Sequence, residues 1–145
     1  MKITKTNPNA ITPTRSTKDS AGYDLYACIN DQIRIWPGQK LMIGTGIRMA
    51  IPSGYFGGIY ACSGLSVKHG VRPATCVSVI DSDYRGEVIV PLLNERERVF
   101  DINPGDRIAQ IVFQKYGVFD MEEVEELDST ERGTGGFGST GKNDN

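Results

Sequence analysis

The sequence lacks the features that define several large classes of protein. None of its apolar runs approaches the length of a membrane span, and its first ten residues, MKITKTNPNA, lack the apolar core of a signal peptide. Its three cysteines, Cys28, Cys62 and Cys76, form no CxxC pair, which argues against a disulfide framework or a structural zinc site. We therefore expect free thiols, no membrane association and a cytoplasmic or nuclear location.

An excess of positive charge is absent as well. The 18 Asp and Glu residues outnumber the 16 Lys and Arg residues, so the formal net charge is -2. Broad binding to nucleic acid normally requires a basic face, so we expect no nucleic-acid partner and only local contacts to any polyanion. His69 is the single histidine, and a surface or loop position is expected for it rather than a catalytic one.

Short segments rich in β-branched and aromatic residues recur between turn signals. This spacing is typical of an all-β sandwich or barrel, and 145 residues suffice for one domain. Two segments, 63–70 and 121–127, could form short helices, although the second could equally form a strand. Apolar residues become scarce after about residue 127, so we predict one β domain over 1–128 and a mobile, glycine-rich arm over 129–145. The expected strands are QIRIW, KLMIGTGIRMAI, YFGGIYA, CVSVIDSDY, EVIVPLLN, RVFDI and RIAQIVFQKY.

Two polar segments could carry chemistry, although each also has a local explanation. IDSDYRGE at 80–87 is rich in carboxylates, but Asp, Ser and Gly also favour ordinary turns. RGTGGFGSTG at 132–141 could be a tail without a function. A plain tail needs neither Arg132 nor Phe137, however. Glycines with Ser and Thr can bind an anion through backbone N–H groups, and an aromatic ring can stack on a base.

Five segments taken together resemble the motifs of the trimeric dUTPases. They occur in the family's order and span nearly the whole chain: AGYDLYA at 21–27, SGLSVKHGV at 63–71, VIDSDYRGEV at 79–88, GDRIAQIVF at 105–113 and RGTGGFGSTG at 132–141. The resemblance implies a jelly-roll-like β fold and a homotrimer whose sites are shared between subunits. It also implies hydrolysis of dUTP to dUMP and pyrophosphate with Mg²⁺.

The resemblance also assigns catalytic and phosphate-binding roles. Asp81 matches the carboxylate that deprotonates the attacking water, a role that suits an acceptor-only group. Asp24 matches an acidic position near the metal-bound waters, and Mg²⁺ is expected on the triphosphate and waters with no direct protein ligand. Phosphate contacts are implied for Ser63, Gly64 and Gln110.

Further residues match the parts of the family that bind the nucleoside and the γ-phosphate. Tyr84 matches the ring that packs on the deoxyribose and excludes a 2′-hydroxyl. The strand from Thr75 to Val79, with Val77 and Ser78 in it, matches the hairpin whose backbone reads uracil. The arm is expected to close over the nucleotide, with Phe137 on the uracil and with Arg132, Gly138, Ser139 and Thr140 on the γ-phosphate.

Three positions depart from the family pattern. Cys62 stands where the pattern has an arginine that contacts phosphate, Ser78 stands in place of a glycine, and Thr75 stands where some members have asparagine. Cys62 leaves open a lowered activity, unless Lys68 or Arg72, which follow closely in sequence, supplies the lost charge. Cys62 and Ser78 also leave open an alternative function as a nucleotide-binding regulatory protein that turns over poorly. A dCTP deaminase relative is a second alternative, which is disfavoured because IDSDYRG is present. The sequence predicts no particular protein partner.

Overall fold

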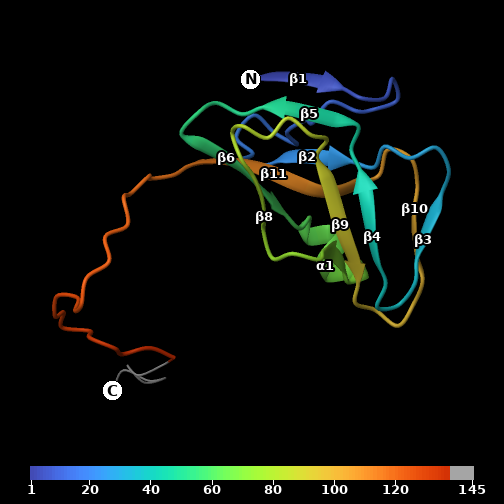
Figure 1. The fold of residues 1–145 in the computed structure, drawn as a ribbon. Helices are drawn as coiled ribbons and strands as arrows, with labels where there is room; N and C mark the ends of the chain where they lie inside the picture. Colours follow the sequence, from blue (N-terminus) through green and yellow to red (C-terminus); the bar gives the residue numbers. More distant parts are fainter. Residues whose placement is uncertain (138–145) are drawn as a thin grey trace.

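The computed structural model describes residues 1–137, and it confirms a mostly β fold with one short helix in this part of the chain (Figure 1). The helix, α1, spans Ser63–His69 and confirms the helical alternative for this segment. The strands are β1 (Lys2–Lys5), β2 (Tyr23–Tyr26), β3 (Ile33–Ile35), β4 (Lys40–Gly44), β5 (Ile47–Ala50), β6 (Tyr55–Tyr60), β7 (Val71–Pro73), β8 (Ser78–Ile80), β9 (Ile89–Asn94), β10 (Phe100–Ile102) and β11 (Arg107–Lys115).

All strand pairs are antiparallel, and the described strands do not close into one barrel. The largest sheet has the order β2-β11-β6-β8, and a second sheet has the order β4-β9-β7. Two smaller pairs, β1-β5 and β10-β3, complete the arrangement. Because neighbours in a sheet come from distant parts of the sequence, residues of separate motifs are brought side by side.

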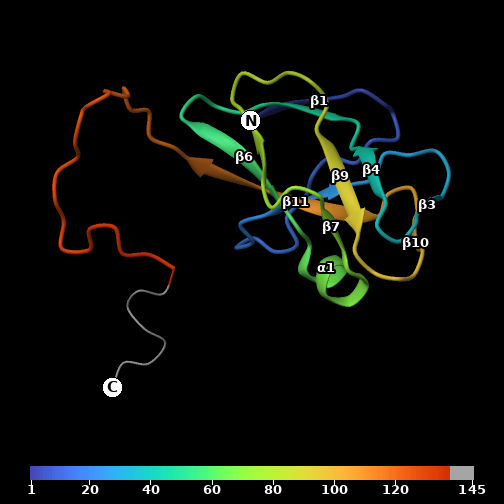
Figure 2. The same cartoon turned by 60° about the horizontal axis from the view of Figure 1, so that its bottom comes forward.

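One apolar core lies between the sheets. β9 shows the alternation expected for a strand with one covered face, because every second side chain from Val90 is buried. Burial of such side chains contributes about 1.5–3 kcal/mol each. The helix α1 buries none of its residues and lies at the lower end of the domain in Figure 2. The largest fully buried side chains are Leu25, Ile35, Ile43, Ile47, Ile59, Leu92, Ile102, Ile108 and Ile111.

Two sequence-based expectations about elements are wrong. The run 40–51 is not one strand, because the chain turns at Thr45 and Gly46 between β4 and β5. Gly46 has a φ of 68°, a left-handed conformation that glycine adopts without steric cost. The segment 121–127 forms neither a helix nor a strand, and its Val124 and Leu127 are exposed, so no core contact selects a regular structure there.

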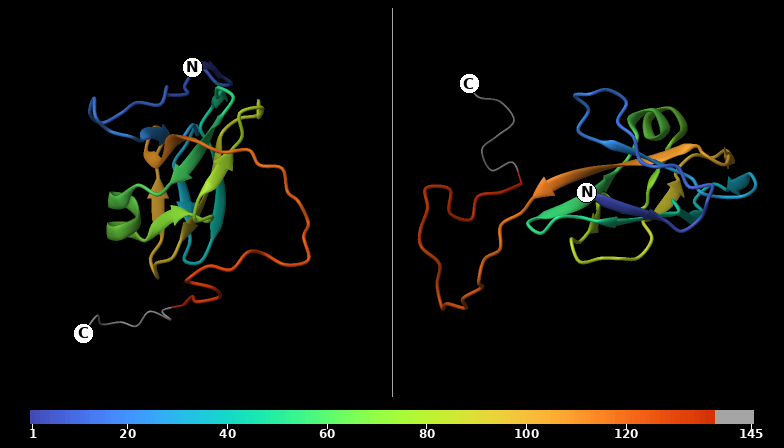
Figure 3. Two further views of the ribbon diagram at one scale, coloured as in Figure 1. Left: turned by 90° about the vertical axis from the view of Figure 1, so that its left-hand side faces the viewer. Right: turned by 90° about the horizontal axis from the view of Figure 1, so that it is seen from above.

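The chain leaves the domain after β11. Residues 116–137 contain no helix or strand and run outward from the sheet, as both views of Figure 3 show. The predicted boundary at residue 128 stays a prediction. Among residues 1–137, no helix is long and apolar enough to cross a membrane.

Candidate active site

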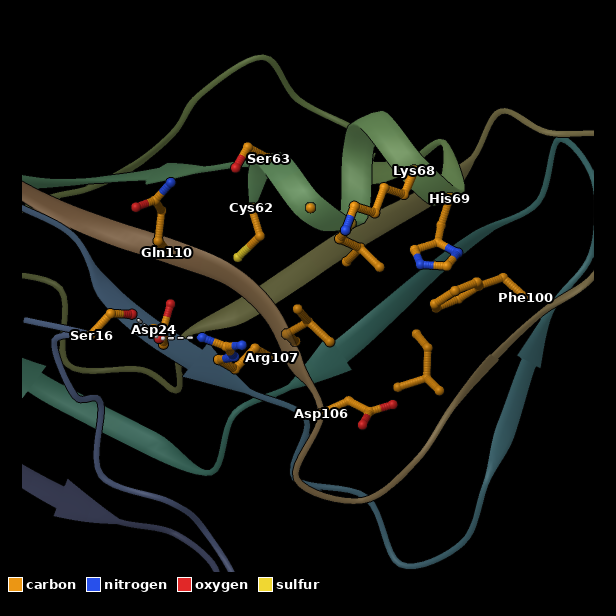
Figure 4. A pocket seen from close by; sticks show the side chains of 14 residues that line it. Ser16, Asp24, Cys62, Ser63, Lys68, His69, Phe100, Asp106, Arg107 and Gln110 are labelled. Atoms are coloured by element: carbon orange, nitrogen blue, oxygen red, sulfur yellow. Dashed lines mark hydrogen bonds and ion pairs between the residues drawn. The ribbon is translucent and has the colours of Figure 1, made fainter.

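A cavity of about 660 Å³ lies beside α1, and five of the predicted site residues line it. Figure 4 shows the side chains around this cavity and the elements from which they come. The five residues are Asp24 from β2, Cys62, Ser63 and Gly64 from the start of α1, and Gln110 from β11. The structure therefore brings three sequence motifs together in one place.

Sheet register explains why Asp24 and Gln110 meet. The two residues are directly opposite in the antiparallel pair of β2 and β11, and Gln110 is also opposite Tyr60 of β6. Directly opposite residues in an antiparallel pair project from the same face of the sheet. The chain continues from Tyr60 to Ala61, whose carbonyl accepts a hydrogen bond of 3.0 Å from Gln110 Nε2. The amide of Gln110 therefore lies next to the residues that begin α1.

An irregularity in β11 adds Arg107 to the same cavity. Residues three apart in a regular strand point to opposite faces, yet Arg107 and Gln110 both line the cavity. The register of β11 against β2 shifts between Arg107 and Ala109, which is the signature of a bulge. Ile108 and Ala109 are both buried in succession, as this break in the alternation requires.

Asp24 is held by two groups on one of its oxygens. Ser16 Oγ donates a hydrogen bond of 3.2 Å to Oδ2, and Arg107 Nη1 lies 3.3 Å from the same atom (Figure 4). The side chain of Asp24 is 15% exposed and that of Arg107 is 61% exposed, so only the carboxylate end of this ion pair is sheltered from solvent. Its Oδ1 accepts no hydrogen bond from the described residues, which leaves this oxygen for water or a ligand.

Cys62 supplies neither a helix cap nor a positive charge. It is the N-cap residue of α1, and its side chain makes no capping hydrogen bond. Burial raises the pKa of its thiol, and the nearby carboxylate of Asp24 raises it further, while Arg107 acts in the opposite direction. The thiol is therefore neutral near pH 7, where a guanidinium would be charged.

The hairpin that was predicted to read uracil lies within the described residues. Its polar side chains already form a hydrogen bond with each other. The hydroxyl groups of Thr75 and Ser78 share a short hydrogen bond, so Ser78 turns toward the loop. Strand β8 pairs with β6, with Ser78 opposite Ile59 and Val79 opposite Gly58. The neighbouring side chains of Val77 and Val79 are exposed.

Asp81 and Tyr84 lie apart from the cavity. Neither residue lines it, and in Figure 1 the loop after β8 lies near β5, at the other end of the domain from α1. Hydrogen bonds within the loop shape it: Tyr84 N donates to Asp81 O at 3.2 Å, and Tyr84 Oη donates to Glu87 O at 3.1 Å. Arg85 Nη1 also donates to the carbonyl oxygens of Ser82 and Tyr84. Within a single chain, the predicted base is thus separated from the predicted phosphate-binding residues.

The carboxylate of Glu87 fastens the end of this loop. Its Oε1 accepts a hydrogen bond of 2.8 Å from Gly46 N, and its Oε2 accepts one of 3.2 Å from Thr6 Oγ1. The following residue, Val88, donates from its backbone N–H to Ile47 O at 2.8 Å. The loop is therefore tied to β5 and to the segment after β1.

The described part of the arm does not reach the cavity. Arg132 Nε donates to Gly135 O at 2.9 Å, and Phe137 is fully exposed with a φ of 51°. The predicted contacts of Gly138, Ser139 and Thr140 lie outside the described residues. The roles of all arm residues stay predictions.

Sequence reasoning assigned no place in the site to several residues that line the cavity. Arg107 lies inside a segment that was recognised, so its position next to Gln110 was a usable signal. His69 packs on Phe100 with ring centroids 5.2 Å apart, a contact between residues too distant in sequence to anticipate. The other lining residues without an assigned role are Ser16, Leu65, Ile102, Asp106 and Ile108.

Comparison with known proteins agrees with these motifs. The profile of the dUTPase family matches residues 8–141. The deoxyuridine 5′-triphosphate nucleotidohydrolase of Debaryomyces hansenii is 47% identical, over 99% of this chain and 88% of its own length.

Two solved structures are also similar. A mutant of the Staphylococcus bacteriophage 80alpha dUTPase with dUpNHpp has a TM-score of 0.88 at 27% identity, covering 97% of both chains. A mutant dUTPase of phage phi11 of S. aureus, which coordinates a structural Mg(II) ion, has a TM-score of 0.79 at 25% identity, covering 88% of this chain and 98% of its own. The chain belongs to the dUTPase family.

Proposed function

We propose that this dUTPase hydrolyses dUTP to dUMP and pyrophosphate in a site that needs more than one copy of the chain. The observation that carries the proposal is the cavity beside α1, where the motifs around Asp24, Ser63 and Gln110 meet in a chain of this family. The first-turn N–H groups of α1 have no partner within the helix, and they add polar groups to the lining of the cavity.

Asp81 acts as the general base in this proposal. The water oxygen forms a bond to the α-phosphorus, and the bond from that phosphorus to the bridging oxygen of the β-phosphate breaks. The carboxylate of Asp81 takes the water proton, and pyrophosphate leaves with the bridging oxygen. Ser63, Gly64 and Gln110 hold the phosphates, while Tyr84 packs on the deoxyribose. The hairpin around Val77 and Ser78 reads uracil through its backbone.

Magnesium belongs to the proposal as part of the substrate complex. Within residues 1–137, no group of three His, Cys, Asp or Glu residues is arranged to hold a metal ion. Phosphate-bound Mg²⁺ typically uses one or two carboxylates together with substrate oxygens and waters. The unpaired Oδ1 of Asp24 fits that role, because it can accept from a metal-bound water. The ion would neutralise triphosphate charge.

A homotrimer with shared sites is the finer part of the proposal. It is supported by the separation of Asp81 from the cavity within one chain. It is also supported by large apolar side chains that one chain leaves exposed, including Trp36 and Met42 at 57% and 68%. In such an assembly the loop with Asp81 from one copy faces the cavity of another, and the arm closes over the nucleotide.

A pyrophosphate-release assay tests this function. We expect release from dUTP, with kcat/KM for UTP and dCTP lower by about 10²-fold or more, because a site shaped to one base and sugar rejects altered ones. Ammonia release from dCTP would instead indicate a deaminase. Tight binding of dUpNHpp without pyrophosphate release from dUTP would favour the regulatory alternative.

Gly22 is expected to be important for the position of Gln110. A Cβ at residue 22 would lie 2.2 Å from Gln110 Oε1, so Gly22→Ala must displace the amide. We expect kcat/KM for dUTP to fall about 10-fold or more, since misplacing a substrate-binding group by 1 Å is costly. The control is the double variant with Gln110→Ala, in which Gly22→Ala should add little. Equal losses with and without Gln110 would contradict this explanation.

A further inference from the structure

Two lysine or arginine side chains line the cavity, Lys68 and Arg107, and they differ in how their charge is balanced. Arg107 lies 3.3 Å from Asp24, so a carboxylate already offsets its charge. Lys68 forms no hydrogen bond or ion pair with any of residues 1–137. Its ammonium group is therefore the uncompensated cation of this cavity.

The neighbouring thiol makes this cation important. Cys62 lines the same cavity at a position where the family pattern has arginine, and burial keeps its thiol neutral. A triphosphate that enters the cavity would find no guanidinium at residue 62. Another group must balance the negative charge of the triphosphate at this point, or that charge remains unbalanced.

The direction of Lys68 suits it to this task. Lys68 is in the last turn of α1, and helical side chains lean toward the N-terminus of their helix. Figure 4 shows its stem running from the end of the helix into the cavity, toward the side where Cys62 lies. The helix end is supported, because His69 packs on Phe100 and the N–H of Gly70 bonds to Leu65 O and Ser66 O.

Arg72, the other cation close in sequence, is already engaged. Its Nε and Nη2 donate to the two carboxylate oxygens of Glu95 at 2.9 and 2.7 Å, and it does not line the cavity. This hydrogen-bonded pair raises the pKa of Arg72 and lowers that of Glu95. Arg72 would have to leave a bidentate partner before it could bind phosphate.

We propose that Lys68 binds the triphosphate of dUTP and supplies the positive charge that Cys62 does not. The inference rests on the proposed function, because it concerns the same substrate and the same cavity. Lysine acts here as a point charge, without the planar fork by which arginine binds two oxygens. Lys68 is thus a substrate-binding residue whose charge contributes more to binding because residue 62 is a cysteine.

The test compares Lys68→Ala with Arg72→Ala by calorimetric binding of dUpNHpp and dUMP. Alanine is the best helix former, so α1 should be kept. We expect Lys68→Ala to raise Kd for dUpNHpp roughly 10- to 100-fold, the range for a hydrogen bond to a charged group. Kd for dUMP should change less than about threefold, because the β- and γ-phosphates are missing. Arg72→Ala should leave both constants close to wild type.

The second part of the test adds Cys62→Arg. It should restore most of the lost dUpNHpp affinity in the Lys68→Ala background and give a smaller gain in the wild type. Unchanged dUpNHpp affinity in Lys68→Ala would overturn the proposal, as would equal losses for dUpNHpp and dUMP, which indicate a structural role. Neither result would affect the proposed function, which fails only if the wild-type protein releases no pyrophosphate from dUTP.

Discussion

Asp81→Asn is expected to lower kcat for dUTP by at least about 10²-fold, the effect of losing a positioned general base. Asparagine has nearly the same shape as aspartate, but its amide cannot take a proton from water. The backbone hydrogen bond from Tyr84 N to Asp81 O does not involve the side chain, so the loop should keep its form. Steady-state pyrophosphate release measures the effect, and dUpNHpp binding should stay close to wild type.

Asp83→Asn is the matched control for this substitution. It removes a carboxylate from the same loop, where Asp83 is exposed. We expect it to retain most of the activity. If Asp81→Asn retained near-normal turnover, or if Asp83→Asn caused the larger loss, Asp81 would not be the base.

Mixed oligomers are expected to regain activity that neither of two inactive parents has. One parent carries Asp81→Asn, and the other carries Asp24→Asn together with Gln110→Ala, which alters the cavity only. If each site takes its loop from one copy and its cavity from another, each mixed trimer has roughly a third of its sites intact. Co-expression with two affinity tags, purification through both, and pyrophosphate release measure the recovery.

A chain with all three substitutions, co-expressed with wild type at equal levels, provides the control. In mixed trimers purified through both tags, shared sites leave roughly a sixth of the sites intact, whereas sites within one chain leave roughly a half. Recovery near zero from the two inactive parents, with half activity in the control, would contradict the shared site.

Strand content could be predicted from the sequence, because segments such as YFGGIYA are rich in β-branched and aromatic residues. The strands β1 and β7 could not, since they have only four and three residues and little periodicity. The break between β4 and β5 escaped prediction because apolar residues continue on both sides of Gly46. In these cases pairing partners decide the structure, and a single sequence does not contain that information.

The candidate site could likewise be predicted only in part. Motif order was enough to name Asp24, Ser63 and Gln110, which the cavity brings together. It could not place Arg107 beside them, because a bulge in β11 sets that position. Nor could it reveal that Asp81 lies at the other end of the chain's own domain, since strand register and assembly are properties of tertiary and quaternary structure.

The attachment of Glu87 to Gly46 and Thr6 has a consequence for genetics. These contacts lie outside the cavity, yet they tether the segment that carries Asp81. A screen for loss of function should therefore recover substitutions at Thr6 and Glu87 that no inspection of the nucleotide site would select. Suppressors of a weakened catalytic loop should also arise at these positions. A stronger anchor there can restore the alignment of the loop without altering any group that touches the substrate.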